Sequence, residues 1–289
     1  MSREVYLPRN LDEFRELRDR RPYAALYAGG TDLLVRMRQG LLDPPALICL
    51  ERIEVLKKVE DREGLLFLGA GATHAELLEH PAVRRRLPVL ARALEVLGSP
   101  PIRHMGTIGG NIVTASPAGD TLPPLYTLDA EVEILSSMGS RRRKINEFIL
   151  GPGRTDLKPG ELLLGVLVPV DPAFHLHHFE KVGPRNALAI ALVSLAALLS
   201  INDSGLIEKA KLAWGSVGPT VVTSAKVEAA LVGRPLTRDT LEEAAALARA
   251  AVSPIDDLRA DAEYRRAVAG NLVLRLINYT RRPGPAPAL

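Results

Sequence analysis

The chain has 289 residues, of which 47% are hydrophobic and 25% charged, and its formal net charge is +3. This composition is typical of a globular protein long enough to form two hydrophobic cores. The charge is too small to indicate nucleic-acid binding, and no apolar run approaches the roughly 20 residues that cross a bilayer. Because residues 1–10 also lack the apolar stretch of a secretory signal, we expect a cytoplasmic protein without a membrane span.

The cysteine, histidine and arginine patterns exclude several kinds of site. A single cysteine, Cys49, rules out an internal disulfide, a cysteine-bound iron–sulfur cluster and a thiolate zinc site within this chain, and its apolar neighbours predict a buried structural thiol. His175 and His177 would share one face of a strand, but without accompanying cysteines or carboxylates we predict no metal site. The basic runs at 84–86 and 141–144 are interpreted as solvated faces, with a partner-protein contact as the alternative.

In chain order, the residues before Pro172 predict a mixture of helices and strands. Asn10 followed by Glu13 is typical of a helix cap with its reciprocal acid. From this cap onward we expect helices over Leu11–Arg21, Ala75–His80 and Val83–Leu97, strands over Ala24–Ala28, Ala46–Glu51, Val132–Leu135 and Glu161–Val168, a hairpin of Val55–Val59 and Leu65–Gly69 around Glu60–Gly64, and a loop-rich stretch without a helical period over Gly98–Pro124.

After Pro172 the pattern changes to longer strands followed by helices. Asn202–Gly205 is a turn signal between two of these strands. We expect strands over Phe174–Val182, Leu188–Leu199 and Leu212–Val217, and then helices over Ala225–Leu231, Leu241–Ala251 and Tyr264–Tyr279. The change predicts a domain boundary near Pro172, and the proline-containing tail 281–289 is expected to be disordered.

Two segments share a glycine-rich pattern that suits a phosphate group. The first is Tyr27–Leu33 and the second is Met105–Asn111, and each has paired glycines beside a threonine. A dinucleotide diphosphate needs several backbone N–H donors at short range, and only residues without a Cβ allow two chain segments to approach it so closely. One such segment alone could be a tight turn with an aspartate cap, but two together favour one cradle.

A third glycine-containing segment, Gly69–His74, follows a strand and opens a helix as a dinucleotide fingerprint would. The third glycine of that fingerprint is replaced by His74, and no acidic residue stands about 20 positions further on to bind a ribose. We therefore predict a tight turn in which Thr73 caps the next helix.

Asp120 follows the second glycine loop closely, in the run Thr114–Pro124. It could cap a short helix that extends toward Leu128, or accept hydrogen bonds from a ribose or adenine. A carboxylate near a diphosphate would be repelled by it, so the nucleoside end is favoured if Asp120 binds a ligand at all.

These residues resemble the FAD-binding medium subunit of molybdenum hydroxylases, a family that includes aerobic carbon monoxide dehydrogenase, xanthine dehydrogenase and isoquinoline or nicotinate oxidoreductases. The resemblance extends in order over nearly the whole chain. It is found in Gly29–Leu33, Ile102–Asn111, Ala115–Pro117, Asp120, Glu161–Leu163, Phe179–Lys181 with Arg185, and Ala262–Arg266.

The resemblance implies an α+β fold. Residues 1–172 would form a two-part FAD-binding domain of the vanillyl-alcohol-oxidase (PCMH) type, with subdomains of about 1–52 and 53–172. Residues 173–280 would form a C-terminal flavoprotein domain with a three-stranded antiparallel sheet and helices.

The resemblance also implies which residues contact FAD. Carried over by position, the two glycine loops hold the diphosphate, Asp120 lies on the nucleoside side, and Leu163 and Lys181 line the cofactor nearer the flavin ring. A cation there would stabilise the negative charge of the reduced flavin, whereas the alternative for Lys181 is a surface lysine at a strand end. The implied contacts are Ala28, Gly29, Gly30, Thr31, Asp32, Leu33, Thr107, Ile108, Gly109, Gly110, Asn111, Thr114, Asp120, Leu163 and Lys181, with no residue assigned to catalysis or to a metal.

The chain departs from the family pattern after Arg185. Many relatives place an aspartate and often an aromatic residue there, whereas this chain has Asn186–Ala189. The contacts on that face of the flavin, and with them the electron acceptor, are therefore expected to differ. The branch that inserts an additional cysteine-ligated cluster is disfavoured, because Cys49 alone cannot supply the ligands.

The function implied is electron relay within a molybdenum hydroxylase. An iron–sulfur small subunit would pass electrons from a molybdopterin large subunit to the FAD of this chain, and the flavin would deliver them to NAD⁺, oxygen or a quinone-type carrier. By family analogy the assembly would be a dimer of heterotrimers. The alternatives are a self-contained flavin-dependent reductase with the same FAD-binding fold, and a nucleotide-binding or scaffold protein in which the glycine loops are only turns.

Overall fold

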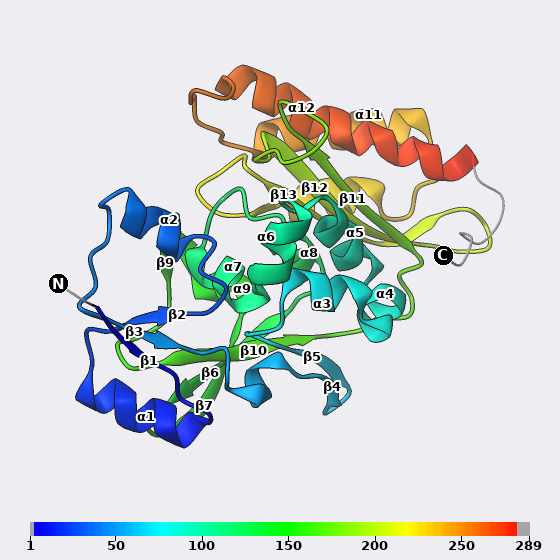
Figure 1. Ribbon diagram of the computed structural model, residues 1–289. Coiled ribbons are helices and arrows are strands. Elements are labelled where there is room, and N and C mark those ends of the chain that lie inside the picture. The colour runs from blue at the N-terminus through cyan, green and yellow to red at the C-terminus, as the bar shows by residue number, and fades with distance from the viewer. Residues whose placement is uncertain (1–2, 282–289) are drawn as a thin grey trace.

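The computed structural model describes residues 3–281, which form an α+β fold (Figure 1). It contains one parallel sheet, several antiparallel sheets and helices that pack against them. The expected α+β class is confirmed. No helix within 3–281 is both long and apolar enough to cross a membrane. Residues 1–2 and 282–289 lie outside the described residues. The tail 281–289, predicted to be disordered, therefore falls almost entirely outside them.

The N-terminal subdomain is a small parallel sheet with two helices. Asn10 caps the first helix as predicted, because its side chain accepts a hydrogen bond of 2.8 Å from Glu13 N. The free thiol of Cys49 is buried at the end of the central strand, as expected. The elements are β1 (Glu4–Tyr6), α1 (Leu11–Arg20), β2 (Ala25–Tyr27), α2 (Leu33–Arg38) and β3 (Ala46–Cys49), in the strand order β1-β3-β2.

The second subdomain is built on a five-stranded antiparallel sheet in the order β4-β5-β10-β6-β7. The predicted hairpin is present, but its first strand starts later, because η1 (Glu54–Lys57) occupies most of the expected strand. Glu63 and Gly64 both have positive φ, 53° and 81°, so a two-residue turn lets the strand continue to Arg62. The sheet consists of β4 (Val59–Arg62), β5 (Leu65–Gly69), β6 (Glu131–Ser136), β7 (Gly139–Lys144) and β10 (Leu162–Val168).

Short helices cover one face of this sheet, and two expectations about them are wrong. The helix expected over Val83–Leu97 breaks before Pro88, since the residue preceding a proline is disfavoured in helical conformation. The stretch Gly98–Pro124, expected to lack helices, contains two and the start of a third, which is the short helix toward Leu128 offered as an alternative. The elements here are α3 (His74–Glu79), α4 (Pro81–Arg86), α5 (Pro88–Val96), α6 (Pro100–Met105), α7 (Ile108–Thr114), α8 (Leu122–Thr127), α9 (Ile145–Phe148), β8 (Ile149–Gly151) and β9 (Arg154–Thr155).

The C-terminal part consists of an antiparallel sheet in the order β11-β12-β13-β14, covered by helices. The three expected strands are present, and a two-residue strand extends the sheet at one edge. Asn202 forms the predicted turn by accepting hydrogen bonds from Ser204 N and Leu206 N. The elements are β11 (Leu176–Val182), β12 (Val193–Ile201), β13 (Ile207–Gly215), β14 (Val222–Thr223), α10 (Ala225–Leu231), α11 (Arg238–Ala251), α12 (Ala262–Leu274) and η2 (Arg275–Arg281).

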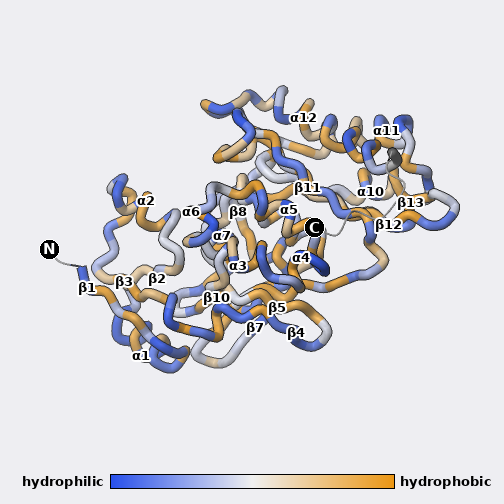
Figure 2. The backbone as a smooth tube through the Cα atoms, turned by 45° about the vertical axis from the view of Figure 1, so that its right-hand side comes forward, coloured by the Kyte–Doolittle hydropathy of each residue, from blue (hydrophilic) through white to orange (hydrophobic). Residues whose placement is uncertain are grey.

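The C-terminal sheet is buried on both faces, which accounts for the nearly continuous apolar run of β12 (Figure 2). Leu195, Ala197 and Leu199 pack with the core under α10, α11 and α12. Ala196 and Leu198 point the other way and join the core of the second subdomain, against α5 and α8. Residues on the two sides of Pro172 therefore share one core. The division into domains 1–172 and 173–280 stays a prediction, and we do not propose that the two segments fold independently.

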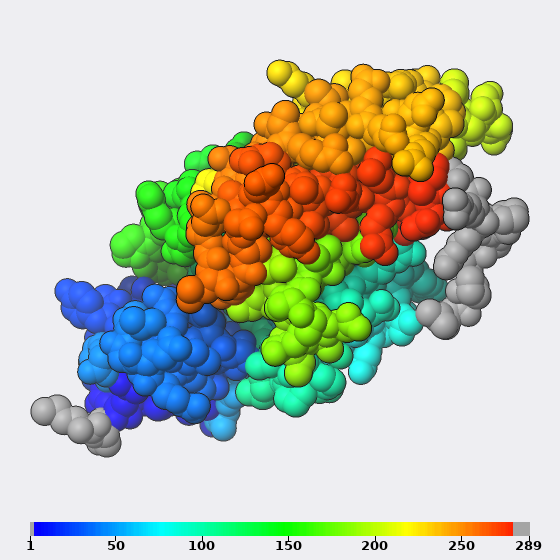
Figure 3. Space-filling model, turned by 90° about the horizontal axis from the view of Figure 1, so that it is seen from above, coloured from blue at the N-terminus to red at the C-terminus, as the bar shows by residue number. Residues whose placement is uncertain are grey.

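The space-filling view shows how the N-terminal subdomain and the C-terminal helices are distributed over the surface (Figure 3). Seen from above, the N-terminal subdomain occupies one end of the molecule, and α11 and α12 extend across the opposite part. The helices thus cover the outer face of the C-terminal sheet and leave its inner face to the second subdomain.

Because the sheet depends on both layers, we predict that unfolding is a single transition. Trp214 is the sole tryptophan, is fully buried, and donates to Ala269 O over 3.1 Å, so its fluorescence reports on the outer layer. Its red shift in denaturant should coincide with the loss of far-UV circular dichroism. Leu198→Ala, on the inner face, should move both curves together and cost about 2–5 kcal/mol. A tryptophan transition clearly separated from the dichroism transition would contradict the shared core.

Candidate functional site

A cavity of about 480 Å³ lies between the two N-terminal subdomains. Figure 1 shows α2 on one side of this region and α6 and α7 on the other. Most of the residues predicted from the sequence line it, namely Ala28, Gly29, Gly30, Thr31, Asp32, Leu33, Thr107, Gly109, Gly110, Asn111, Thr114 and Leu163. We call it the glycine-lined cavity.

The two glycine loops touch each other at Gly29. A Cβ added to Gly29 would lie 1.8 Å from Met105 O, 2.6 Å from Met105 C and 2.9 Å from Gly106 Cα. No side chain can occupy such a position without separating the two backbones. The close approach that the glycine pattern predicts is therefore present, and it forms the junction between the subdomains at the cavity wall.

The first loop leaves backbone donors unused. Gly30 has φ +71°, a conformation that favours glycine, and its carbonyl accepts from Leu34 N to start α2. Among the described residues, the N–H groups of Gly29, Gly30 and Thr31 have no acceptor. Asp32 stands at the N-cap position of α2 but makes no capping hydrogen bond, so the alternative of a tight turn with an aspartate cap is wrong. These free N–H groups suit an anionic ligand.

The second loop uses most of its donors within the protein. Thr107 Oγ1 accepts from Gly110 N over 3.1 Å and so caps α7. The side chain of Asn111 accepts from Thr121 Oγ1 over 2.6 Å, which leaves the Asn111 amide N–H₂ available at the cavity. Ile108 is fully buried in the core and does not line the cavity, so its predicted contact with the cofactor stays a prediction.

A third segment, the turn Gly69–His74, also lines the cavity, and the sequence interpretation missed this role. Thr73 caps α3 as predicted, in a reciprocal pair with Glu76. Three backbone hydrogen bonds of 2.9–3.0 Å also join the turn to the second glycine loop, from Gly109 N to Ala70 O, Ile108 N to Ala72 O and His74 N to Gly106 O. The available signal was the second glycine of the turn, Gly71, which together with Ala70 and His74 forms part of the wall.

Asp120 and Lys181 lie outside this cavity and form a buried ion pair of 2.6 Å, with side chains only 8% and 7% exposed. Burial raises the pKa of Asp120 to about 6, against the opposing effect of Lys181. Asp120 Oδ1 is buried without a partner in the described part of the chain. Because the two side chains touch, Asp120 and Lys181 share one location in the fold, and the placement of Asp120 on the nucleoside side with Lys181 nearer the ring stays a prediction. The helix-cap alternative is wrong, since Thr121 holds the N-cap position of α8.

Each partner of the ion pair is connected to a different cavity. Asp120 is adjacent to Thr121, which donates to Asn111 in the glycine-lined cavity. Lys181 lines a second cavity of about 440 Å³ together with the loop 183–189. In that loop Arg185 donates to the carbonyls of Ala187 and Leu188, so the segment that departs from the family pattern is held by its own arginine.

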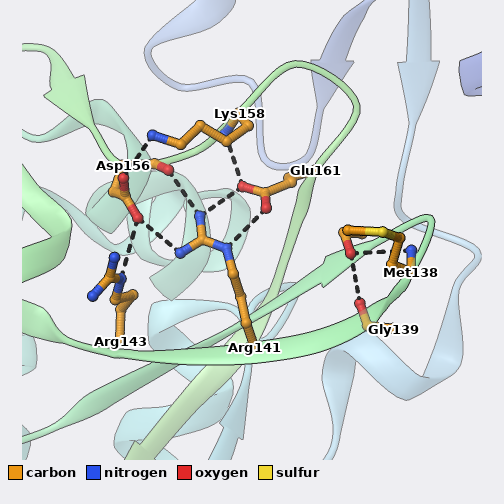
Figure 4. Close-up of polar contacts among 8 residues, drawn as sticks. Met138, Gly139, Arg141, Arg143, Asp156, Lys158 and Glu161 are labelled. Atoms are coloured by element: carbon orange, nitrogen blue, oxygen red, sulfur yellow. Dashed lines mark hydrogen bonds and ion pairs between the residues drawn. The ribbon is translucent and has the colours of Figure 1, made fainter.

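The second basic run forms part of an ion-pair network beside the glycine-lined cavity (Figure 4). The guanidinium of Arg141 donates to Glu161 over 2.7 and 2.8 Å and to Asp156 over 2.7 Å. Hydrogen bonds from Lys158 and Arg141 lower the pKa of Asp156 to about 2. The network clamps the segment that carries Leu157, a cavity residue, to the edge strand β7. Arg141 is therefore not available to bind a phosphate group, because its guanidinium is already paired with Asp156 and Glu161.

A larger groove of about 650 Å³ carries none of the predicted residues. Its lysines are paired with its own carboxylates, Lys209 with Asp171 and Lys211 with Asp129. No group of histidine, cysteine and acidic residues that could hold a metal ion occurs among residues 3–281. The glycine-lined cavity is therefore the site that the chemistry favours.

Comparison with known proteins agrees with this geometry. Residues 1–171 match the family model described as the FAD binding domain in molybdopterin dehydrogenase, and residues 178–280 match the CO dehydrogenase flavoprotein C-terminal domain. The chain is 32% identical to the nicotinate dehydrogenase FAD-subunit of Eubacterium barkeri, over 83% of this chain and 82% of that protein. It is 29% identical to the carbon monoxide dehydrogenase medium chain of Hydrogenophaga pseudoflava, over 88% of each.

Solved structures show the same likeness over the whole fold. A carbon monoxide dehydrogenase structure from Hydrogenophaga pseudoflava has a TM-score of 0.91 at 29% identity and covers 98% of this chain and 99% of that one. Quinoline 2-oxidoreductase from Pseudomonas putida 86 also has a TM-score of 0.91 at 29% identity, with 96% of each chain covered.

We predict that Gly29→Ala separates the two loops and abolishes FAD retention, because its Cβ would collide with the Met105 carbonyl.

Gly110→Val should also empty the site while the protein stays folded. Only Thr107 Oγ1 lies within 4 Å of a Cβ at this position, and the methyl groups of valine would enter the cavity. FAD content per chain after purification is the measurement. Gly40→Ala is the control for backbone strain without a collision, because Gly40 has φ +72° but an added Cβ there has nothing within 4 Å. Normal FAD content in Gly29→Ala would refute the role of this contact.

Proposed function

Because the chain belongs to the family of FAD-binding subunits of molybdopterin dehydrogenases, we propose that it is the electron-transfer subunit of a molybdenum hydroxylase. It is an oxidoreductase subunit with an FAD-binding domain. In our proposal it takes electrons from an iron–sulfur subunit and passes them from the flavin to NAD⁺, oxygen or a quinone-type acceptor. The observation that carries the proposal is the contact of the two glycine loops over a cavity with free backbone N–H groups.

The residues of the glycine-lined cavity fit a flavin dinucleotide. The free N–H groups of Gly29, Gly30 and Thr31 are suited to diphosphate oxygens, as is the unused amide N–H₂ of Asn111. Apolar side chains of the wall, including Leu163, are suited to the flavin ring or its ribityl chain. We therefore propose as cofactor contacts the predicted residues that line this cavity.

When bound, FAD supplies the exchange between one-electron and two-electron transfer. The chain contributes binding, orientation and exclusion of water. The clamp of Arg141 on Asp156 and Glu161 holds one wall of the cavity in place. Asp120 holds the ammonium of Lys181 in a fixed position beyond the Asn111 end of the cavity, and we propose that this pair sets the local charge near the flavin.

The remaining parts of the proposal concern the assembly. We propose a small iron–sulfur subunit and a large molybdopterin subunit as partners, a dimer of heterotrimers as the assembly, and the cytoplasm as the location. The relatives act on different compounds according to their names, among them nicotinate, carbon monoxide and quinoline. The hydroxylated substrate would accordingly be chosen by the large subunit rather than by this chain.

The alternative, a self-contained flavin-dependent reductase, would need an acid or base at the flavin. The ionisable side chains that line the glycine-lined cavity among the described residues are Asp32, Arg36 and His74. Asp32 lies 3.9 Å from Arg36 in an ion pair, and burial lowers the pKa of His74 to about 4. A histidine with so low a pKa does not match the requirements of proton transfer near neutral pH, and Asp32 is engaged with Arg36, which counts against this alternative.

We expect the purified native complex to contain FAD, molybdenum and iron together with this chain. Addition of the hydroxylase substrate should bleach the visible absorbance of the oxidised flavin through the partner subunits. A complex rebuilt with Gly29→Ala should still oxidise substrate with an artificial dye that accepts electrons at the other subunits, but should lose transfer to the physiological acceptor. Flavin reduction by substrate in the isolated chain would instead favour the self-contained reductase.

We predict that Lys181→Met lowers the midpoint potential of the flavin and spares FAD content. The change removes a buried cation, so the reduced flavin loses stabilisation. A loss of roughly 1.4 kcal/mol would lower a two-electron potential by about 30 mV. Redox titration of the complex is the measurement. Lys211→Met, which removes a half-exposed surface cation paired with Asp129, is the matched control. An unchanged potential in Lys181→Met would remove the proposed tuning role.

A further inference from the structure

His74, the first residue of α3, lies in the wall of the glycine-lined cavity. The residue is only 3% exposed. It packs against Gly106 of the second glycine loop, where an added Cβ would lie 3.1 Å from His74 Cδ2 and 3.3 Å from His74 Nε2. Its backbone N–H also donates to Gly106 O over 2.9 Å. The imidazole is therefore fixed directly behind the loop.

The ring of His74 lacks a hydrogen-bond partner, unlike the other histidines in the interior. His178 pairs Nδ1 with Tyr279 Oη at 3.2 Å, and His177 pairs Nε2 with Phe174 O at 3.0 Å. For His74 the described residues give Nδ1, which is fully buried, no partner at all. His177 Nδ1 and His178 Nε2 are also buried without a partner, so one unpaired nitrogen does not by itself indicate a ligand. What distinguishes His74 is that neither ring nitrogen is paired among the described residues and that the residue lines the cavity, which leaves Nε2 available to a ligand.

The charge state of His74 determines which atom can act. Burial, with a smaller contribution from Arg103, lowers the pKa of the imidazole to about 4, so the ring is neutral near pH 7 and carries one N–H. Nothing accepts a hydrogen bond from Nδ1, so the proton is better placed on Nε2, next to Gly106. A single neutral donor resembles the backbone N–H groups of the first loop, which also bind through dipoles rather than charge.

We propose that the His74 imidazole donates a hydrogen bond from Nε2 to a diphosphate oxygen of the bound dinucleotide. The turn Gly69–His74 then becomes the third binding segment of the site, beside the two glycine loops. The diphosphate is assigned because Gly106 and Thr107, in front of the ring, belong to the loop proposed to hold it. The inference rests on the proposed function for the identity of the ligand.

The test compares two substitutions at His74 in the full-length chain stripped of flavin. His74→Phe keeps a ring of similar size and removes the donor, whereas His74→Gln keeps a donor at a similar reach. We expect His74→Phe to weaken the binding of both FAD and ADP by roughly 10- to 100-fold, as for a hydrogen bond to a charged group, and His74→Gln to recover most of this loss. The thermal midpoint of the flavin-free Phe variant should not fall, because an unpaired buried nitrogen has been removed.

The controls separate this inference from the assignment of the site itself. His104→Phe, on the exposed surface of α6, should bind FAD and ADP as the unchanged chain does. Failure of the unchanged chain to bind either nucleotide would overturn the cavity assignment as a whole. Unchanged FAD affinity in His74→Phe would overturn only the role of His74, and weaker FAD binding with unchanged ADP binding would overturn the diphosphate contact. If His74→Phe is too unstable to assay, His74→Leu replaces it with the same expectations.

Discussion

The site depends on one contact between two stretches of backbone, that of Gly29 with Met105 and Gly106. The distance of 1.8 Å from a hypothetical Cβ to the Met105 carbonyl leaves no room for any side chain. Glycine at this position therefore permits the parallel sheet of the first subdomain and the helices of the second to meet, and the cavity lies where they do. A contact of this kind has no directional bond of its own, so its stability comes from the elements that hold each loop on either side.

Those elements are joined mainly by backbone hydrogen bonds and by paired charges. The turn Gly69–His74 bonds the second loop to β5, and Arg141 clamps the opposite wall. Arg36, which lines the cavity, and Arg141 and Lys181, which lie near it, each have a carboxylate partner within the protein. Arg103, close enough to lower the pKa of His74, donates to Leu97 O instead. A diphosphate in this cavity would consequently meet mainly dipoles among the lining groups. Such an environment holds an anion with little reorganisation, since the donors are fixed by the fold before the ligand arrives.

Features that depend on the local pattern of residues can be predicted from the sequence. Features that depend on packing between distant segments of the chain cannot. The cap by Asn10, the three C-terminal strands and α10 follow from spacing and capping residues alone. The helices α6 and α7 were missed because glycine and proline obscure their period, although Ser99 and Thr107 cap them. The glycine loops could be recognised because paired glycines, which have no Cβ, are typical of places where two backbone segments come close together.

The Asp120–Lys181 pair shows why the rest could not be predicted. The two residues stand on opposite sides of Pro172, and only the packing of the C-terminal sheet on α8 brings them to 2.6 Å. A positional resemblance assigns each residue a place relative to the ligand, but it contains no information about their distance from each other. Since both side chains are almost fully buried, the pair is stable only when both chain segments are docked. Any ligand that contacts this pair would thus favour the docked arrangement of the two segments over any other, because it gains binding energy only in that state.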